Sequence, residues 1–70
     1  MSVRVLVNGE SRELGDQATV ESLVQSLGDQ PEGRGIAVAV DGEVVSRAAW
    51  TRTELADGAR VEVLVAVQGG

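Results

Sequence analysis

The sequence contains no cysteine and no histidine. Without cysteine the chain has no disulfide, no thiolate nucleophile and no Cys-based metal site. Without histidine it lacks the commonest general base and metal ligand of proteins. Lysine and tyrosine are also absent, so that every positive charge is an arginine. These absences remove the commonest catalytic side chains and metal ligands, and they fit a protein that performs no chemistry itself, with no catalytic residue, no metal site and no bound cofactor.

The sequence also lacks a basic stretch and a long apolar run. Its formal net charge is −5, and six scattered arginines among eleven carboxylates form no basic stripe for phosphates, which argues against nucleic acid as a partner. The first four residues lack the charged-then-apolar layout of a signal peptide, and no apolar run approaches the roughly 20 residues that span a bilayer. We therefore expect no membrane contact and a cytoplasmic location.

Trp50 is the only aromatic residue among 70, and the apolar residues are mostly Val, Leu, Ala and Ile. A single domain of this size buries a small core, since about 60 residues bury only roughly 60% of their unfolded surface. The core should be aliphatic and rich in β-branched side chains. We interpret Trp50 as a structural anchor of that core rather than as a ligand-stacking residue.

Two hairpins frame a short helix in the first two thirds of the chain. Residues 3–7 and 10–14 alternate as strands around Asn8-Gly9, the dipeptide typical of a type I′ turn. Residues 36–40 and 43–45 do the same around Asp41-Gly42. Between the hairpins, a helix is predicted with Thr19 as N-cap and Gly28 just past its end. Its apolar residues recur at i, i+3, i+4 and i+7, namely Val20, Leu23, Val24 and Leu27.

The last third predicts one helical turn and one long strand. Ser46 is a possible cap for a turn over residues 46–50, which would bring Trp50 against the core. Asp57-Gly58 then leads into a strand over residues 59–67, with valine at every second position. The fold class is therefore α+β: a four- to five-stranded mixed sheet packed on one helix.

Gln68, Gly69 and Gly70 follow that strand. Two terminal glycines present a thin backbone that ends in a carboxylate and can enter a narrow slot. The alternative is an ordinary frayed end, because chain termini are often disordered. We divide the chain into a folded domain, residues 1–67, and a flexible tail, residues 68–70, in which Val67 is the last residue anchored by the sheet.

These features together resemble the ubiquitin-like β-grasp sulfur carriers, and most closely the ThiS family of thiamine biosynthesis. The resemblance rests on the strand and turn at residues 5–8, on the helix that begins at residues 19–20, and on the Gly-Gly end. The V-x-R-x-x-W segment, residues 45–50, is what points to the thiamine carrier. Ser46 departs from the family, which usually has proline there.

The resemblance implies how the tail would act. A terminal carboxylate is ionised and unreactive at neutral pH, so it must be activated. In the family, an E1-like adenylyltransferase uses ATP to adenylate the terminal glycine, and sulfur from a cysteine desulfurase or equivalent donor displaces AMP. The thiocarboxylate then gives its sulfur to thiazole synthase. Here Gly70 would carry the sulfur, Gly69 would be a slim spacer and Gln68 a hinge.

A docking surface for these partners is expected on the open face of the sheet. If the valines of the first and last strands face the helix, Leu6, Leu64 and Ala66 lie on the opposite face, together with Ala37 and Ala39. Apolar residues grouped on an exposed face often mark a contact surface. We expect a monomer when the carrier is free of these partners.

Two other functions stay open from sequence. One is the small subunit of molybdopterin synthase, also a Gly-Gly sulfur carrier, although that family usually has an aromatic-Pro-Pro stretch before its tail, which residues 64–67 lack. The other is a ubiquitin-like protein-binding module whose tail is incidental. Deletion of Gly70 would distinguish a sulfur carrier of either family from a binding module, because only a carrier needs that residue.

Overall fold

A computed structural model describes residues 2–27 and 35–65 of the chain. The first hairpin joins strand β1 (Ser2–Val7) to strand β2 (Glu10–Gly15) in antiparallel register. Asn8 and Gly9 between them have φ angles of 52° and 86°. Positive φ at both central residues is the mark of a type I′ turn, so the turn predicted from Asn-Gly is confirmed.

Helix α1 (Val20–Ser26) begins with the capping residue that the sequence predicts. The hydroxyl of Thr19 accepts a hydrogen bond from the amide of Ser22, and the hydroxyl of Ser22 accepts one from the amide of Thr19. This reciprocal pair is a capping box, which satisfies two amides that the first turn leaves free. The predicted stop at Gly28 lies outside the described residues.

The second hairpin pairs β3 (Ile36–Val40) with β4 (Glu43–Val45) across a turn at Asp41, whose φ is 51°. A 3₁₀ helix, η2 (Arg47–Arg52), follows and carries Trp50 into the core. The suggested side-chain cap is wrong, because the Ser46 side chain makes no capping hydrogen bond. The main-chain carbonyl of Ser46 accepts from the amide of Ala49 instead, over 2.9 Å.

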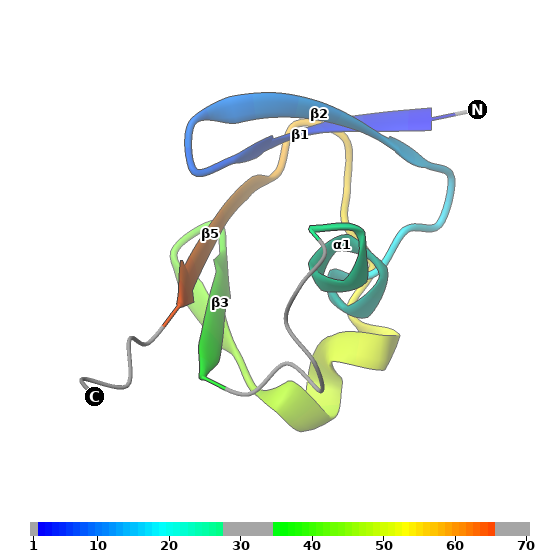
Figure 1. The fold of residues 1–70 in the computed structure, drawn as a ribbon. Coiled ribbons are helices and arrows are strands. Elements are labelled where there is room, and N and C mark those ends of the chain that lie inside the picture. The colour runs from blue at the N-terminus through cyan, green and yellow to red at the C-terminus, as the bar shows by residue number, and fades with distance from the viewer. Residues whose placement is uncertain (1, 28–34, 66–70) are drawn as a thin grey trace.

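Strand β5 (Arg60–Val65) lies in the centre of the sheet, whose order is β2-β1-β5-β3-β4. It runs parallel to β1 and antiparallel to β3, so the sheet is mixed. Figure 1 shows this sheet curving around α1, with β1 and β2 on one side of the helix and β5 and β3 on another. The predicted β-grasp architecture, a mixed sheet of four to five strands packed on one helix, is confirmed, and the sheet has five strands. The last two residues predicted for the final strand, 66 and 67, lie outside the described part.

The core lies between the sheet and the two helices. Its buried side chains come from every second position of β1 and β5, from β3, from α1, from η2 and from the segment after η2. They are Val5, Val7, Val20, Leu23, Val24, Val38, Trp50, Leu55, Ala59, Val61 and Val63. The valine faces predicted for β1 and β5 are thus the buried faces. Full burial of one such aliphatic side chain stabilises the fold by about 1.5–3 kcal/mol.

The start of α1 is tied to the segment that follows η2. The amide of Val20 donates to the carbonyl of Thr53 over 3.0 Å, and the amide of Leu55 donates to the carbonyl of Ala18 over 2.8 Å. These two hydrogen bonds hold the start of α1 and the segment after η2 together on the face of the sheet that the core covers. No helix in the described part of the chain covers the opposite face of the sheet, on which Leu6, Val44 and Leu64 are exposed. We call this the open face.

Candidate functional site

The two faces of β5 have opposite characters. Val61 and Val63 point into the core, whereas Arg60, Glu62 and Leu64 are exposed on the open face. Leu64 is 68% exposed and lies one residue before the end of the described strand. A large apolar side chain is therefore displayed next to the segment that leads to Gly70.

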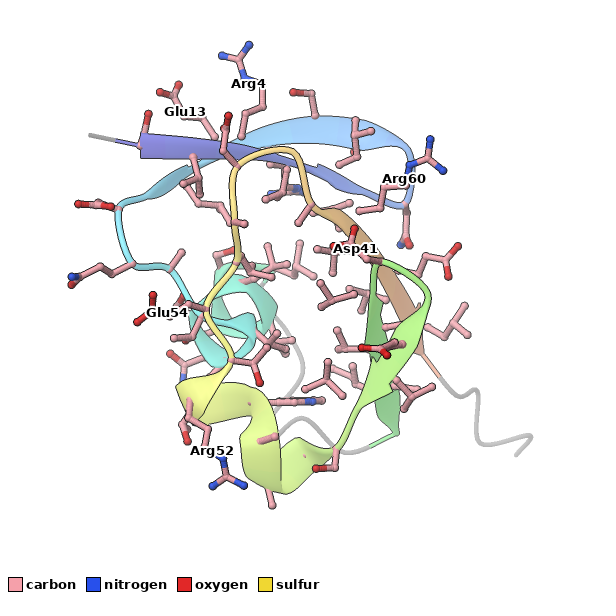
Figure 2. All side chains as sticks on the ribbon, turned by 180° about the vertical axis from the view of Figure 1, so that it is seen from behind. Arg4, Glu13, Asp41, Arg52, Glu54 and Arg60 are labelled. Atoms are coloured by element: carbon pink, nitrogen blue, oxygen red, sulfur yellow. The ribbon has the colours of Figure 1, made fainter. Side chains whose placement is uncertain are left out.

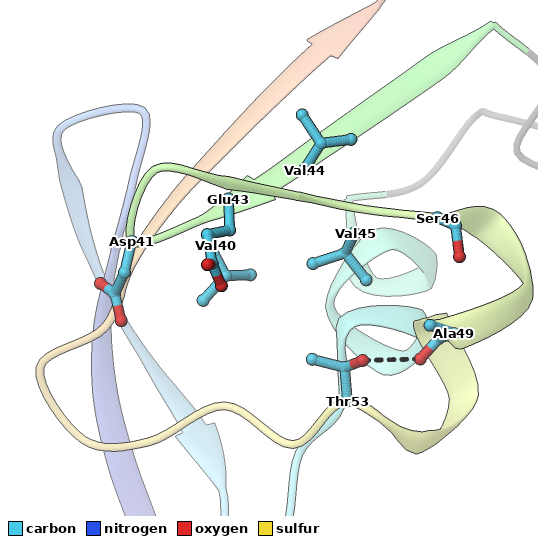
Figure 3. Close-up of a pocket in the computed structure, with 8 residues that line it drawn as sticks. All are labelled: Val40, Asp41, Glu43, Val44, Val45, Ser46, Ala49 and Thr53. Atoms are coloured by element: carbon cyan, nitrogen blue, oxygen red, sulfur yellow. Dashed lines mark hydrogen bonds between the residues drawn. The ribbon is translucent and has the colours of Figure 1, made fainter.

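An apolar strip surrounds Leu64 on the open face. The sheet register places Ala37 directly beside Leu64, and Ala39 directly beside Val44. Val44 is 80% exposed, and Figure 3 shows it on the opposite side of β4 from Val45. We call Ala37, Ala39, Val44 and Leu64 the apolar strip; it runs across β5, β3 and β4.

Leu6 lies on the same open face but apart from the strip. It pairs with Arg60 in the parallel ladder, and Arg60 and Glu62 come before Leu64 along β5. Arg60, the partner of Leu6, comes four residue steps before Leu64 along β5, which is about 13 Å at roughly 3.3 Å per residue. Leu6 is 38% exposed and borders a separate hollow, which Asn8, Gly9, Arg60 and Glu62 also line. The structure thus brings Leu64 together with the two alanines, and not with Leu6.

The part of the open face over β1 and β2 is polar. Arg4 pairs with Glu13 across the two strands, and the hydroxyl of Ser2 donates to a carboxylate oxygen of Glu13. Figure 2 shows Arg4 and Glu13 at this end of the molecule, both directed outward. The open face is therefore divided into a charged half over β1–β2 and a half over β5–β3–β4 that carries the apolar strip, with Arg60 and Glu62 of β5 between the strip and Leu6.

The remaining predicted site residues lie outside the described residues. These are Ala66, which was assigned to the docking surface, and the tail residues Gln68, Gly69 and Gly70. The expectation that Val67 is the last anchored residue falls there too. What the structure places is the strand that leads to them, which β1 and β3 flank on its two sides.

Two residues with a place in this region were missed from sequence. Val44 could have been found by carrying the two-residue alternation through the Asp41-Gly42 turn, because a two-residue loop puts position 44 opposite Ala39. Asn8 was read only as a turn residue, but its carboxamide also hydrogen-bonds the main chain of Val63. No sequence pattern signals that second contact.

A further hollow is lined by residues of β4 and η2, together with Val40, Asp41, Ser46 and Thr53 (Figure 3). The hydroxyl of Thr53 at its wall donates to the carbonyl of Ala49 over 2.7 Å. The Thr53 hydroxyl therefore makes a hydrogen bond within the fold itself. In the described part of the chain, no group of three or more carboxylates could hold a metal ion, and no helix is long and apolar enough to cross a membrane.

Comparison with known proteins gives consistent matches. The family model described as "ThiS family" matches residues 5–70, which include both C-terminal glycines. The crystal structure of the thiamine biosynthesis protein (ThiS) from Geobacter metallireducens superposes with a TM-score of 0.77 at 32% identity, over 97% of this chain and 100% of that one.

A curated relative contains a similar stretch within a much longer chain. The thiazole synthase of Paramagnetospirillum magneticum is 29% identical over 68 residues, which are 97% of this chain and 20% of that protein. The chain thus spans about a fifth of the length of this relative.

Proposed function

The chain belongs to the ThiS family, and we propose that it carries sulfur for thiamine biosynthesis as a thiocarboxylate on Gly70. The observation that carries this proposal is the family match over residues 5–70, which spans both the sheet and the Gly-Gly end. The similarity to the Geobacter metallireducens protein over 97% of this chain supports the same role. In this role the chain is a co-substrate of other enzymes and not itself an enzyme.

The proposed chemistry acts on the terminal carboxyl group of Gly70. First, a carboxylate oxygen attacks the α-phosphorus of ATP in an E1-like adenylyltransferase, which forms an acyl adenylate and releases pyrophosphate. Second, the outer sulfur of a persulfide on a cysteine desulfurase or equivalent donor attacks the acyl carbon, and the carbon–oxygen bond to AMP breaks. A thiol reductant then cleaves the sulfur–sulfur bond of the acyl disulfide, which leaves the thiocarboxylate on Gly70 and a disulfide on the thiol side. The first step thus replaces an unreactive carboxylate by a mixed anhydride, from which AMP is a good leaving group. The lack of Cys, His and Lys in the chain fits a protein on which partners act.

We propose thiazole synthase as the acceptor of the sulfur. In the Paramagnetospirillum magneticum protein, a stretch similar to this chain is part of one polypeptide named thiazole synthase. Two domains joined in one chain have a high effective concentration for each other, which is an advantage when one domain must transfer a group to the other. The same pairing as separate chains would require a docking surface.

The apolar strip is the proposed docking surface for the activating enzyme. Leu64 and Val44 are large apolar side chains at 68% and 80% exposure, which is costly in water unless a partner covers them. Leu64 also precedes Gly70 by only six residues, so a partner that covers the strip has the tail within reach. The charged half over β1–β2 would lie at the rim or outside this contact, because charged residues are depleted from interface centres.

Pyrophosphate exchange tests the proposal. The wild-type chain, mixed with the E1-like enzyme and ATP, should support exchange of labelled pyrophosphate into ATP. A variant that lacks Gly70 retains the apolar strip, so it should give no exchange but should inhibit exchange by the wild-type chain. Equal exchange with and without Gly70 would contradict the proposal. Binding to the enzyme without exchange by the wild-type chain would favour a binding module instead.

A further inference from the structure

The side chain of Asn8 bridges to the main chain of β5. The amide of Val63 donates to Oδ1 of Asn8 over 2.9 Å, and Nδ2 of Asn8 donates to the carbonyl of Val63 over 3.1 Å. Both hydrogen bonds are partly buried. The carboxamide therefore does for Val63 what the peptide group of a neighbouring strand would do. We call this pair of hydrogen bonds the Asn8 bridge.

The Asn8 bridge stands where β1 leaves the sheet. The parallel ladder between β1 and β5 pairs only Leu6 with Arg60 and Val7 with Val61. The main chain then turns at Asn8, whose amide still donates to the carbonyl of Val61 over 2.9 Å. A β1 strand that continued straight would pair next with Val63. Because the turn removes that strand, only the Asn8 side chain meets the amide and carbonyl of Val63 from this side in the described structure.

After Val63, the described part of β5 pairs with β3 only. Leu64 and Val65 pair with Ala37 and Ile36 of β3, whereas the described β1 ladder does not reach them. Val63 is therefore the last described residue of β5 that is held on both sides. The position and direction of the main chain at Val63 therefore bear on those of Leu64 and Val65, the last two residues of β5.

We infer that Asn8 is a positioning residue for the acyl transfer at Gly70, an inference that rests on the proposed function. The Asn8 bridge fixes the end of β5 relative to the apolar strip, so that a partner docked on the strip receives the tail in one direction. Without the bridge the strip still docks, but the tail enters the active site in fewer of the docked complexes. The expected loss is in kcat and not in KM for the carrier, because a small misplacement of a reacting group lowers the rate steeply.

Asp41 offers a matched control in the other hairpin. It too is the first central residue of a turn, with a φ of 51°, and its carboxylate accepts from the amide of Arg60 over 2.9 Å. Its own amide donates to the carbonyl of Arg60. This contact holds the first residue of β5, at the end away from the tail. Loss of the Asp41 side chain should disturb a hairpin and β5 to a similar extent, but it leaves the Asn8 bridge intact.

The experiment compares Asn8→Gly with Asp41→Gly. Glycine adopts positive φ freely, so each turn keeps its geometry while its side-chain contact to β5 is lost. Adenylation by the E1-like enzyme is measured with ATP against carrier concentration. For Asn8→Gly we expect kcat to fall about 10-fold with KM within about twofold of wild type, and for Asp41→Gly both constants within about twofold. Hydrogen exchange of the Val63 amide should speed up only in Asn8→Gly.

Each other outcome has a defined meaning. Unchanged kcat in Asn8→Gly, equal losses in both variants, or a rise in KM alone would overturn the positioning role. A wild-type chain that is not adenylated would overturn the proposed function, and the role of Asn8 with it. If Asn8→Gly does not fold, Asn8→Asp carries the test, because a carboxylate keeps the acceptor for the Val63 amide but loses the donor. Its kcat should then be below that of Asp41→Gly, and equality would overturn the inference.

Discussion

The guanidinium of Arg47 lies over the ring of Trp50, with its central carbon 5.2 Å from the ring centroid. The indole nitrogen of Trp50 donates to the carbonyl of Val45 over 3.1 Å. These two contacts give a physical reason for the V-x-R-x-x-W spacing: three residues of one short segment fold onto each other. The segment serves to hold η2 against the core, and Trp50 is a structural anchor.

Replacement of Trp50 by alanine should destabilise the fold severely. The side chain is 2% exposed, and loss of a buried tryptophan costs about 3–5 kcal/mol, a large share of the stability of a small domain. Urea unfolding followed by far-ultraviolet circular dichroism measures the change, since Trp50 is the only aromatic fluorophore. Arg47→Ala is the matched control and should cost only about 0.5–1 kcal/mol. A loss of equal size in both variants would contradict this account of the segment.

The capping box of α1 gives a second stability prediction. Thr19→Ala removes the acceptor for the Ser22 amide and should cost about 1 kcal/mol in the free energy of unfolding. Thr19→Ser keeps the hydroxyl and should change stability by less than about 0.5 kcal/mol. Urea titrations of wild type and the two variants measure the free energy of unfolding. An alanine variant as stable as wild type would show that the capping box does not stabilise the fold.

Leu64→Asp should impair docking without unfolding the protein. Because Leu64 is 68% exposed, we expect a change in stability within about 0.5 kcal/mol. A charge at the centre of the proposed contact should raise KM for adenylation about 10-fold or more. Steady-state kinetics with the E1-like enzyme measure this, and circular dichroism checks the fold.

Leu6→Asp and Val44→Asp define the extent of the contact. Val44 belongs to the apolar strip, so its variant should raise KM in the same direction as Leu64→Asp. Leu6 is separated from the strip by Arg60 and Glu62, so its variant should have a smaller effect, below about threefold. An effect of Leu6→Asp as large as that of Leu64→Asp would mean that the contact covers both halves of the open face.

The sequence was sufficient to predict the fold because its local signals agree with one another. Asn8-Gly9 and Asp41-Gly42 require two-residue hairpins, Thr19 marks a helix start, and the valines of β1 and β5 define one buried face. The Ser46 cap failed for a local reason: a 3₁₀ turn was closed by the main-chain carbonyl, which leaves no sign in the residue type.

The site was less predictable, because it depends on contacts between distant segments. Leu6 and Leu64 share a face by alternation, yet only the strand register shows that charged residues lie between them. The Asn8 bridge joins positions 55 apart in sequence. Side-chain contacts of this kind follow from where strands end and not from any periodic pattern.

The mass of the intact chain tests the central claim most directly. The protein is incubated with ATP, the E1-like enzyme, a cysteine desulfurase with cysteine, and a thiol reductant. Its intact mass is then measured by mass spectrometry, with the Gly70-deleted protein as control. We predict a mass increase equal to the exchange of one oxygen for sulfur, located at Gly70 by fragmentation and absent from the control. An unchanged mass, under conditions in which a known carrier is converted by the same enzymes, would contradict the assignment of Gly70 as the sulfur-carrying residue.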